Sequence, residues 1–241
     1  MERGGALLVT DFDGTMTQRD FYRQALAMLV PPGTRDYWDD YLAGVMTHFE
    51  ALAAIFTRIR ASEGQVMAAA RRMGLDPHAG QAVATLRDAG WEVAVLSAGC
   101  AWYIRRLLAE QGVELELHAN PGEFDPSRGL LMSLPADSPF LIPTTGIDKV
   151  AFVRNALCHY GRVAFAGDGQ PDLPAALLVP PDLRFARGWL AEHLSAEGIP
   201  FRAFGEWSEI AEMLASQLVV SYAAKRSSVE PACRKLRSEA E

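Results

Sequence analysis

The residues of this sequence best suited to chemistry are two aspartates near its start. Asp11 and Asp13 follow an apolar run at residues 6–9, and Gly14 and Thr15 then turn the chain. An apolar run that ends in such a turn predicts a buried strand of a parallel sheet, and ligands of these sheets bind beyond the carboxyl ends of the strands. Side chains at i and i+2 of an extended segment point the same way, so we expect the two carboxyl groups to be crowded together.

Crowded carboxylates repel one another unless a cation compensates them, and Mg²⁺ is the hard divalent cation that usually does so. A carboxylate held against a metal and a phosphate can also act as a nucleophile. Taken alone, the stretch could instead be a plain surface turn, because Asp and Gly are common in turns.

A second acidic pair follows another predicted strand, at residues 162–167. Asp168 and Asp172 stand there, and the glycines at 167 and 169 allow a close approach of the backbone. An ordinary Asp-Gly turn is the alternative. We interpret the two acids as partners of the first pair at the same edge of the sheet.

Two further positions suit an anion. Ser97 ends a predicted strand at residues 92–97, and its hydroxyl and the N–H of Ala98 would stand at a helix N-terminus, a place that binds phosphate. Simple capping of that helix is the alternative. Lys149 begins a helix that Asp148 caps, where the helix dipole disfavours a cation. A phosphate and the aspartate cluster would explain the lysine, whereas an exposed lysine is the alternative.

The elements between these motifs divide the chain. Residues 18–75 contain no convincing strand, and apolar residues at helical spacing predict four helices, a natural lid over the first acidic pair. We expect most of the aromatic residues in this insert to form its core and one or two to line a pocket. We also expect a strand at 113–118, a hairpin returning at 130–134, and a loop at 135–147. A helix at 207–218 should close the fold, and the polar residues 225–241 should form a flexible tail.

Composition limits the class of protein. The 241 residues, 49% of them hydrophobic, suffice for one domain or a domain plus a cap, and the net charge of −7 predicts no nucleic-acid partner. The three cysteines, Cys100, Cys158 and Cys233, are far apart in the sequence, which predicts free thiols in a reducing compartment. The sequence shows no leader and no apolar run long enough for a bilayer, so we expect a cytoplasmic protein without a membrane partner, as a monomer or homodimer.

The four motifs, DFDGT, Ser-Ala-Gly, Lys149 and GDGQPD, occur in the order found in the haloacid dehalogenase superfamily of aspartate-nucleophile phosphatases, which this sequence resembles. Within that superfamily it is similar to the phosphoserine phosphatase branch. The resemblance implies an α/β fold, a Rossmann-like parallel sheet core flanked by helices, with a helical cap inserted after the first strand. It assigns residues 1–17 and 76–224 to the core and 18–75 to the cap.

The resemblance also implies roles for the motif residues. Asp11 would attack phosphorus and form an aspartyl-phosphate, and Asp13 would serve as general acid and then as base. Mg²⁺ would be held by Asp11, the backbone carbonyl of Asp13 and Asp168, with Asp172 as a ligand or as a support for the ligands. Ser97, the N–H of Ala98 and Lys149 would bind the phosphoryl oxygens. Ala98 stands where the family usually has glycine.

The expected substrate is a small phosphorylated metabolite. The sequence most resembles the methionine-salvage phosphatases that act on 2-hydroxy-3-keto-5-methylthiopentenyl-1-phosphate, in Pro31-Pro32, residues 38–59, FARGWLAEHL and residues 204–210. A phosphoserine phosphatase is the alternative: Asp20 could match its early acid and Phe49 its cap phenylalanine. Phe56 stands where those enzymes have arginine, although Arg58 is close. A phosphotransferase or a non-catalytic phosphate-binding regulator on the same fold are further alternatives.

Overall fold

A computed structural model of the protein describes residues 4–216. The tail predicted for residues 225–241 and the end of the helix predicted for residues 207–218 lie outside the described residues. Within them, residues 208–216 are helical, as predicted.

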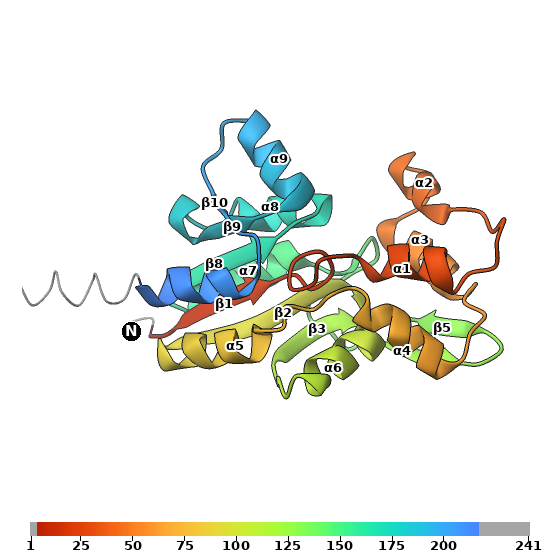
Figure 1. The fold of residues 1–241 in the computed structure, drawn as a ribbon. Coiled ribbons are helices and arrows are strands. Elements are labelled where there is room, and N and C mark those ends of the chain that lie inside the picture. The colour runs from red at the N-terminus through yellow and green to blue at the C-terminus, as the bar shows by residue number, and fades with distance from the viewer. Residues whose placement is uncertain (1–3, 217–241) are drawn as a thin grey trace, which may run out of the picture.

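Six parallel strands form one sheet, with β1 (Ala6–Thr10) at an inner position between β2 (Trp91–Cys100) and β8 (Arg162–Gly167) (Figure 1). Toward one edge β2 is followed by β3 (Glu116–Asn120), and toward the other β8 is followed by β9 (Arg184–Ala186) and β10 (Arg202–Ala203). Thr10, the last residue of β1, pairs with Val95 on one side and Ala166 on the other. The carboxyl ends of these three strands therefore meet at one edge of the sheet, as the sequence predicted.

Helices cover both faces of the sheet, because alternate side chains of the inner strands are buried on opposite sides. In β1, Leu8 packs into one apolar cluster, whereas Leu7 and Val9 pack into the other. The first cluster is covered by α5 (Ala79–Asp88), α6 (Ala101–Glu110) and residues 208–216, and the second by α7 (Lys149–His159), α8 (Leu173–Ala176) and α9 (Gly188–Ala196) (Figure 1). This confirms the predicted class of a Rossmann-like α/β core.

The four helices predicted between the first two strands all form. They lie beyond the carboxyl ends of β1 and β2 and are α1 (Phe21–Met28), α2 (Tyr37–Leu42), α3 (His48–Phe56) and α4 (Glu63–Arg71) (Figure 1). Thr47 and Ser62 cap α3 and α4 with capping boxes, which satisfy N–H groups that a helix start leaves free. The chain enters and leaves this insert side by side, because Thr17 forms a bridge with Leu75. The division into a core and a cap domain at these positions stays a prediction.

Three segments differ from the sequence expectation. β3 begins at Glu116 and not at 113, because the Val113 N–H bonds to the Leu108 carbonyl and so closes the end of α6. The returning strand β5 (Gly129–Met132) pairs with β4 (Gly122–Asp125) and not with β3, which belongs to the main sheet. The predicted loop at 135–147 contains a short antiparallel pair, β6 (Leu141–Ile142) and β7 (Gly146–Ile147).

None of the helices in the described part of the chain has the length and apolar character needed to cross a membrane. Cys100 is buried and Cys158 is exposed, and both are free thiols, as expected for these two.

The contact between the β4–β5 hairpin and α3 yields a stability prediction. Gly129 has a φ of +84°, and a Cβ there would lie 2.5 Å from the carbonyl oxygen of Phe56. We expect Gly129→Ala to lower the free energy of unfolding by about 2–4 kcal/mol, through backbone strain and a steric clash. Gly90→Ala is the matched control: its φ is +75° but no atom lies within 4 Å of the added Cβ, so only the strain of about 1–2 kcal/mol applies. If urea unfolding shows that the two variants lose the same free energy of unfolding, the steric part of the prediction is contradicted.

Candidate active site

The loop after β1 closes onto the end of β8. The Asp11 N–H donates to the Ala166 carbonyl (2.9 Å), which continues the strand pairing by one residue. Thr15 Oγ1 donates to Asp168 Oδ1 (2.7 Å). Gly14 has a φ of +78°, and a side chain there would collide with the Asp168 carboxylate. Only glycine therefore lets this loop reach the second acidic motif.

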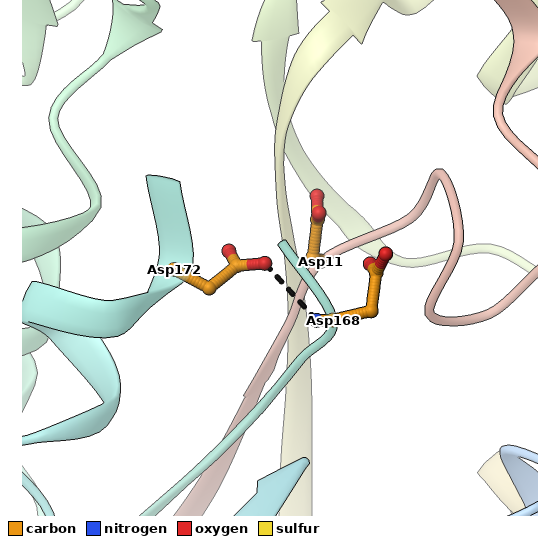
Figure 2. A group of neighbouring side chains, drawn as sticks. All are labelled: Asp11, Asp168 and Asp172. Carbon is orange, nitrogen blue, oxygen red and sulfur yellow. Dashed lines mark hydrogen bonds between the residues drawn. The ribbon is translucent and has the colours of Figure 1, made fainter. Parts of the chain in front are cut away.

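Three carboxylates meet where β1 and β8 end. Asp11, Asp168 and Asp172 each offer an oxygen atom within 4.8 Å of the others (Figure 2). Asp13 is not in this group, and it contributes least among the acids that raise the pKa of Asp11. Because β1 ends at Thr10 and the loop begins, the alternation of a strand no longer applies to the two side chains.

A buried lysine neutralises part of this charge. Lys149 is 5% exposed, and its Nζ lies 3.0 Å from Asp11 Oδ1 and 2.6 Å from Asp172 Oδ1. Lys149 is the first residue of α7, and Asp148 caps that helix through the Ala151 N–H, as predicted. The two carboxylates offset the unfavourable helix dipole, and the alternative of an exposed lysine is excluded.

Asp172 has both oxygen atoms engaged. Oδ1 accepts from Lys149, and Oδ2 accepts from the backbone N–H groups of Asp168 (3.1 Å) and Gly169 (3.0 Å). Gly167 is necessary here, because a Cβ would lie 2.6 Å from the Asp172 carboxyl carbon. This arrangement favours the second of the two roles expected for Asp172, that of a support for its neighbours.

The pKa shifts in the cluster indicate that the single charge of Lys149 does not neutralise the three carboxylates. Burial raises the pKa of Asp11 well above its usual value, Lys149 opposes the rise, and Asp172 and Asp168 add to it. Burial, followed by the charge of Asp172, raises the pKa of Asp168 to about 8. Burial alone would lower the pKa of Lys149, but Asp11 and Asp172 outweigh it and raise that pKa. Buried carboxylate oxygens with this excess of negative charge fit a hard divalent cation such as Mg²⁺.

Asp13 occupies a different environment from Asp11. Its Oδ1 accepts from the Phe21 N–H (3.0 Å), the Tyr103 hydroxyl lies 2.9 Å from both of its oxygens, and Ser97 Oγ lies 3.4 Å from Oδ2. Burial raises the pKa of Asp13 to about 6, although the Phe21 N–H lowers it. A carboxyl group with a pKa near neutrality is suited to give and take protons.

One of the predicted phosphate-binding residues, Ser97, lies beside Asp13. Ser97 is 1% exposed and sits in an irregular stretch of β2, which continues to Cys100 and does not end at Ser97 as predicted. Ser97 Oγ accepts from the Gly99 N–H (2.9 Å), and Cys100, not Ser97, is the residue before α6. Asn120 Nδ2 donates to the carbonyl of Ala98 (2.8 Å) and so fixes this stretch to the neighbouring strand.

A cavity of about 480 Å³ opens above these groups. Asp11, Asp13, Ser97, Ala98 and Lys149 line it from the sheet, together with Asp168 and Asp172. Five aromatic side chains of the helical insert line it from the other side: Tyr22, Trp38, Tyr41, His48 and Phe56.

The three candidate substrate residues of the insert are placed differently from one another. Asp20 lines the cavity, where it forms an ion pair with Arg23 (3.2 Å). Phe49 and Arg58 are not part of its lining; the exposed guanidinium of Arg58 donates to the hydroxyl of Tyr37. The structure thus brings one of the three to the site.

Sequence reasoning missed several residues that the structure brings to the site. The sequence predicts only a turn at Thr15, and Tyr103 lies on the apolar side of α6, where spacing indicates core. His48 is a half-buried imidazole of the cavity wall, and desolvation lowers its pKa to about 4, so it is neutral near pH 7. Trp189, on the core side, is 41% exposed and also lines the cavity. No local pattern distinguishes these residues from ordinary core or surface.

Known proteins share this fold. A HAD family hydrolase from Salmonella enterica subsp. enterica serovar Typhi superposes with a TM-score of 0.65 at 18% identity, covering 88% of this chain and 71% of its own. Phosphoserine phosphatase from T. onnurineus superposes with a TM-score of 0.58 at 19% sequence identity, covering 89% of this chain and 96% of its own. A phosphoserine phosphatase solved as an analogue of its phospho-aspartyl intermediate superposes with a TM-score of 0.57 at 16% sequence identity. The match covers 88% of this chain and 99% of that phosphatase. A search of curated proteins found no significant match.

The sequence also matches a family model. The model for haloacid dehalogenase-like hydrolases matches residues 8–177, which include every motif residue from Asp11 to Asp172. The chain therefore belongs to the haloacid dehalogenase-like hydrolase family. This confirms the superfamily and the prediction of a hydrolytic enzyme, and its structural neighbours include phosphatases.

The carboxylate cluster predicts a pH dependence of stability. Without a bound cation, burial and the charge of Asp172 raise the pKa of Asp168 to about 8 in the folded protein, whereas an unfolded aspartate has a pKa of about 4. The folded state therefore binds more protons between these values, and the free energy of unfolding falls as pH rises, by at most about 1.4 kcal/mol per pH unit. We expect Asp168→Asn to flatten this slope between pH 6.5 and 8 in urea unfolding of protein treated with EDTA. Identical slopes for the two proteins would contradict the assignment.

Proposed function

We propose that the protein is a Mg²⁺-dependent phosphatase that hydrolyses a small phosphate monoester through an aspartyl-phosphate. The observation that carries the proposal is the separation of Asp11 from Asp13. Asp11 lies in the carboxylate cluster, 3.0 Å from the Lys149 ammonium, whereas Asp13 lies apart with a pKa of about 6. The two acids thus have the different environments that a nucleophile and a general acid need.

In the first step, a carboxylate oxygen of Asp11 attacks phosphorus while Asp13 gives its proton to the leaving oxygen. Lys149, Ser97 and the N–H of Ala98 bind the phosphoryl oxygens, whose charge must be neutralised during transfer. In the second step, Asp13, now ionised, takes a proton from the water that hydrolyses the aspartyl-phosphate.

The metal site of this proposal consists of Asp11, Asp168 and the backbone carbonyl of Asp13, supported by Asp172. Bound Mg²⁺ would supply positive charge to the phosphoryl oxygens. The neighbour solved as an analogue of a phospho-aspartyl intermediate supports the covalent step, because it has the same fold. A cap at residues 18–75 over a core at 1–17 and 76–224 is part of the proposal, since α1–α3 supply the aromatic wall of the cavity.

For the substrate, the cavity favours a monoester with an apolar or unsaturated tail. Phe56 lines it at the position where phosphoserine phosphatases carry an arginine, and it is fully buried. Trp38 stacks on Tyr22 with ring centroids 4.0 Å apart, which forms a flat apolar wall. We therefore place the enol-phosphate of methionine salvage first. The enzyme would act on it in the cytoplasm, as a monomer or homodimer.

A phosphoserine phosphatase remains the second candidate, and Asp20 is the observation that favours it. Its carboxylate lines the cavity and could bind a substrate ammonium group. Arg23, which also lines the cavity, could bind a carboxylate only after giving up its ion pair with Asp20. Arg19 lines the cavity too, but its guanidinium donates to the Arg72 carbonyl. Because Asp20 and Arg23 already neutralise each other, they make a weaker site for an amino acid than the aromatic wall makes for an apolar tail.

The hydrolase proposal predicts Mg²⁺-dependent release of phosphate from p-nitrophenyl phosphate. We expect the release to stop on chelation with EDTA, to return with Mg²⁺, and to fall by at least about a thousandfold in Asp11→Asn, which keeps the shape but loses the nucleophile. Release that needs no metal, or that persists in Asp11→Asn, would refute the proposal. A phosphotransferase would instead pass the phosphate to an added alcohol, and a binding regulator would release none.

The substrate proposal predicts a ranking in a panel of phosphorylated metabolites. We expect kcat/KM for the enol-phosphate of methionine salvage to exceed that for phosphoserine by at least about a hundredfold, since the aromatic wall holds an apolar tail, whereas Asp20 and Arg23 must give up their ion pair to bind the ammonium and carboxylate of serine. Asp20→Asn is the matched variant, because it changes kcat/KM for phosphoserine only if Asp20 binds the ammonium group. A preference for phosphoserine that Asp20→Asn removes would establish the second candidate.

A further inference from the structure

We propose that Tyr103 is a positioning residue for the acid/base Asp13, an inference that rests on the proposed phosphatase function. The two residues are far apart in sequence, yet the hydroxyl of Tyr103 lies 2.9 Å from each oxygen of the Asp13 carboxylate. Tyr103 is 0% exposed, on the helix that follows the Ser97 stretch. A buried phenol so close to both oxygens can hold the plane of the carboxyl group as well as its position.

The hydroxyl proton of Tyr103 is directed to Asp13. The backbone N–H of Cys100 donates to the same hydroxyl oxygen at 3.3 Å, so that oxygen already acts as an acceptor on one side. A phenol with one donor on its oxygen still has its own proton to give, and Asp13 is the acceptor that it faces. The Cys100 N–H therefore donates to the Tyr103 hydroxyl oxygen, and the Tyr103 hydroxyl donates its own proton to Asp13.

The tyrosine ring is itself held in place. Phe21 stacks on it with ring centroids 4.3 Å apart, and Phe56 meets it edge to face at 6.5 Å. Gly99 is necessary on the remaining side, since a Cβ there would collide with the Tyr103 hydroxyl and lie 2.7 Å from Asp13 Oδ2. A packed ring and an obligatory glycine mean that the hydroxyl has little freedom to move away from Asp13.

The other partners of Asp13 cannot replace this contact. The Phe21 N–H reaches Oδ1, and Ser97 Oγ lies 3.4 Å from Oδ2, a long distance for a hydrogen bond. Ser97 is also a residue proposed to turn to the phosphate. Among the described residues that contact Asp13, Tyr103 alone lies at hydrogen-bond distance from both oxygens. Without its hydroxyl, the carboxyl group can rotate, and proton transfer to the leaving oxygen loses its geometry.

The test compares two monoesters in Tyr103→Phe, which keeps the packed ring and removes the hydroxyl. Phenyl phosphate has a poorer leaving group than p-nitrophenyl phosphate, so its cleavage depends more on proton donation. We expect kcat/KM to fall about 10–100-fold for phenyl phosphate and by less than about threefold for p-nitrophenyl phosphate. A burst of p-nitrophenol before the steady state is expected as well, because water activation by Asp13 slows. Tyr160→Phe is the matched control: it removes a hydroxyl that donates to Glu92, away from the cavity, and should change neither value.

Each outcome has a consequence. If the unmodified protein shows Mg²⁺-dependent release and Tyr103→Phe lowers both kcat/KM values equally, or neither, the positioning role is refuted while the phosphatase function stands. If the unmodified protein releases no phosphate, the function itself fails. Gly99→Ala tests the same contact independently, by pushing a methyl group toward the hydroxyl. It should shift the ratio of the two kcat/KM values in the same direction, and that ratio cancels any loss of folded protein or of phosphate binding; an unchanged ratio contradicts the inference.

Discussion

The structure depends on a local excess of buried negative charge at the carboxyl ends of β1 and β8. Three carboxylates share this place with one lysine, and removing such ions from water costs several kcal/mol for each. The carboxylates can lie this close together because particular residues around them permit close packing and supply a compensating charge. Glycines at 14 and 167 leave room for Asp168 and Asp172, and the ammonium of Lys149 compensates two of the three acids. What remains uncompensated is negative charge, which a divalent metal ion would balance.

The same constraint separates two aspartates that are only two residues apart. Asp11 faces the cluster, and Asp13 contributes least among the charges that raise the pKa of Asp11. Asp13 instead meets the first N–H of α1 and the Tyr103 hydroxyl. Its burial raises its pKa without placing it against the other acids. One short loop thus supplies a carboxylate matched to cations and a carboxyl group matched to proton transfer, because each is completed by a different part of the chain.

The sequence predicted the parts of the site that lie at the ends of strands. Asp11 and Asp168 follow the ends of β1 and β8, so their places follow from local pattern and the topology of a parallel sheet. Lys149 begins α7, as the cap at Asp148 predicted, whereas Ser97 lies inside β2 and not at its end. The sequence did not predict contacts made between elements that are distant in the chain. The apolar spacing of Tyr103 is that of any core residue, and its contact with Asp13 depends on how α6 lies against the loop after β1. Phe49 and Arg58, which do not line the cavity, show the same limit, since motif spacing says little about which side of a cap helix faces the cavity.

Phe21 shows how closely the helical insert and the acid/base are joined. Its backbone N–H, the first of α1, donates to Asp13, and its ring stacks on Tyr103. Asp20, the residue that precedes α1, makes no side-chain cap, so the Asp13 carboxylate takes over part of that role. A carboxylate at a helix N-terminus is stabilised in its ionised form by the helix dipole, which opposes the effect of burial on Asp13. The pKa of about 6 therefore reflects a balance in which the insert takes part, and a helix that also walls the substrate cavity helps to set the proton affinity of the group that acts on the substrate.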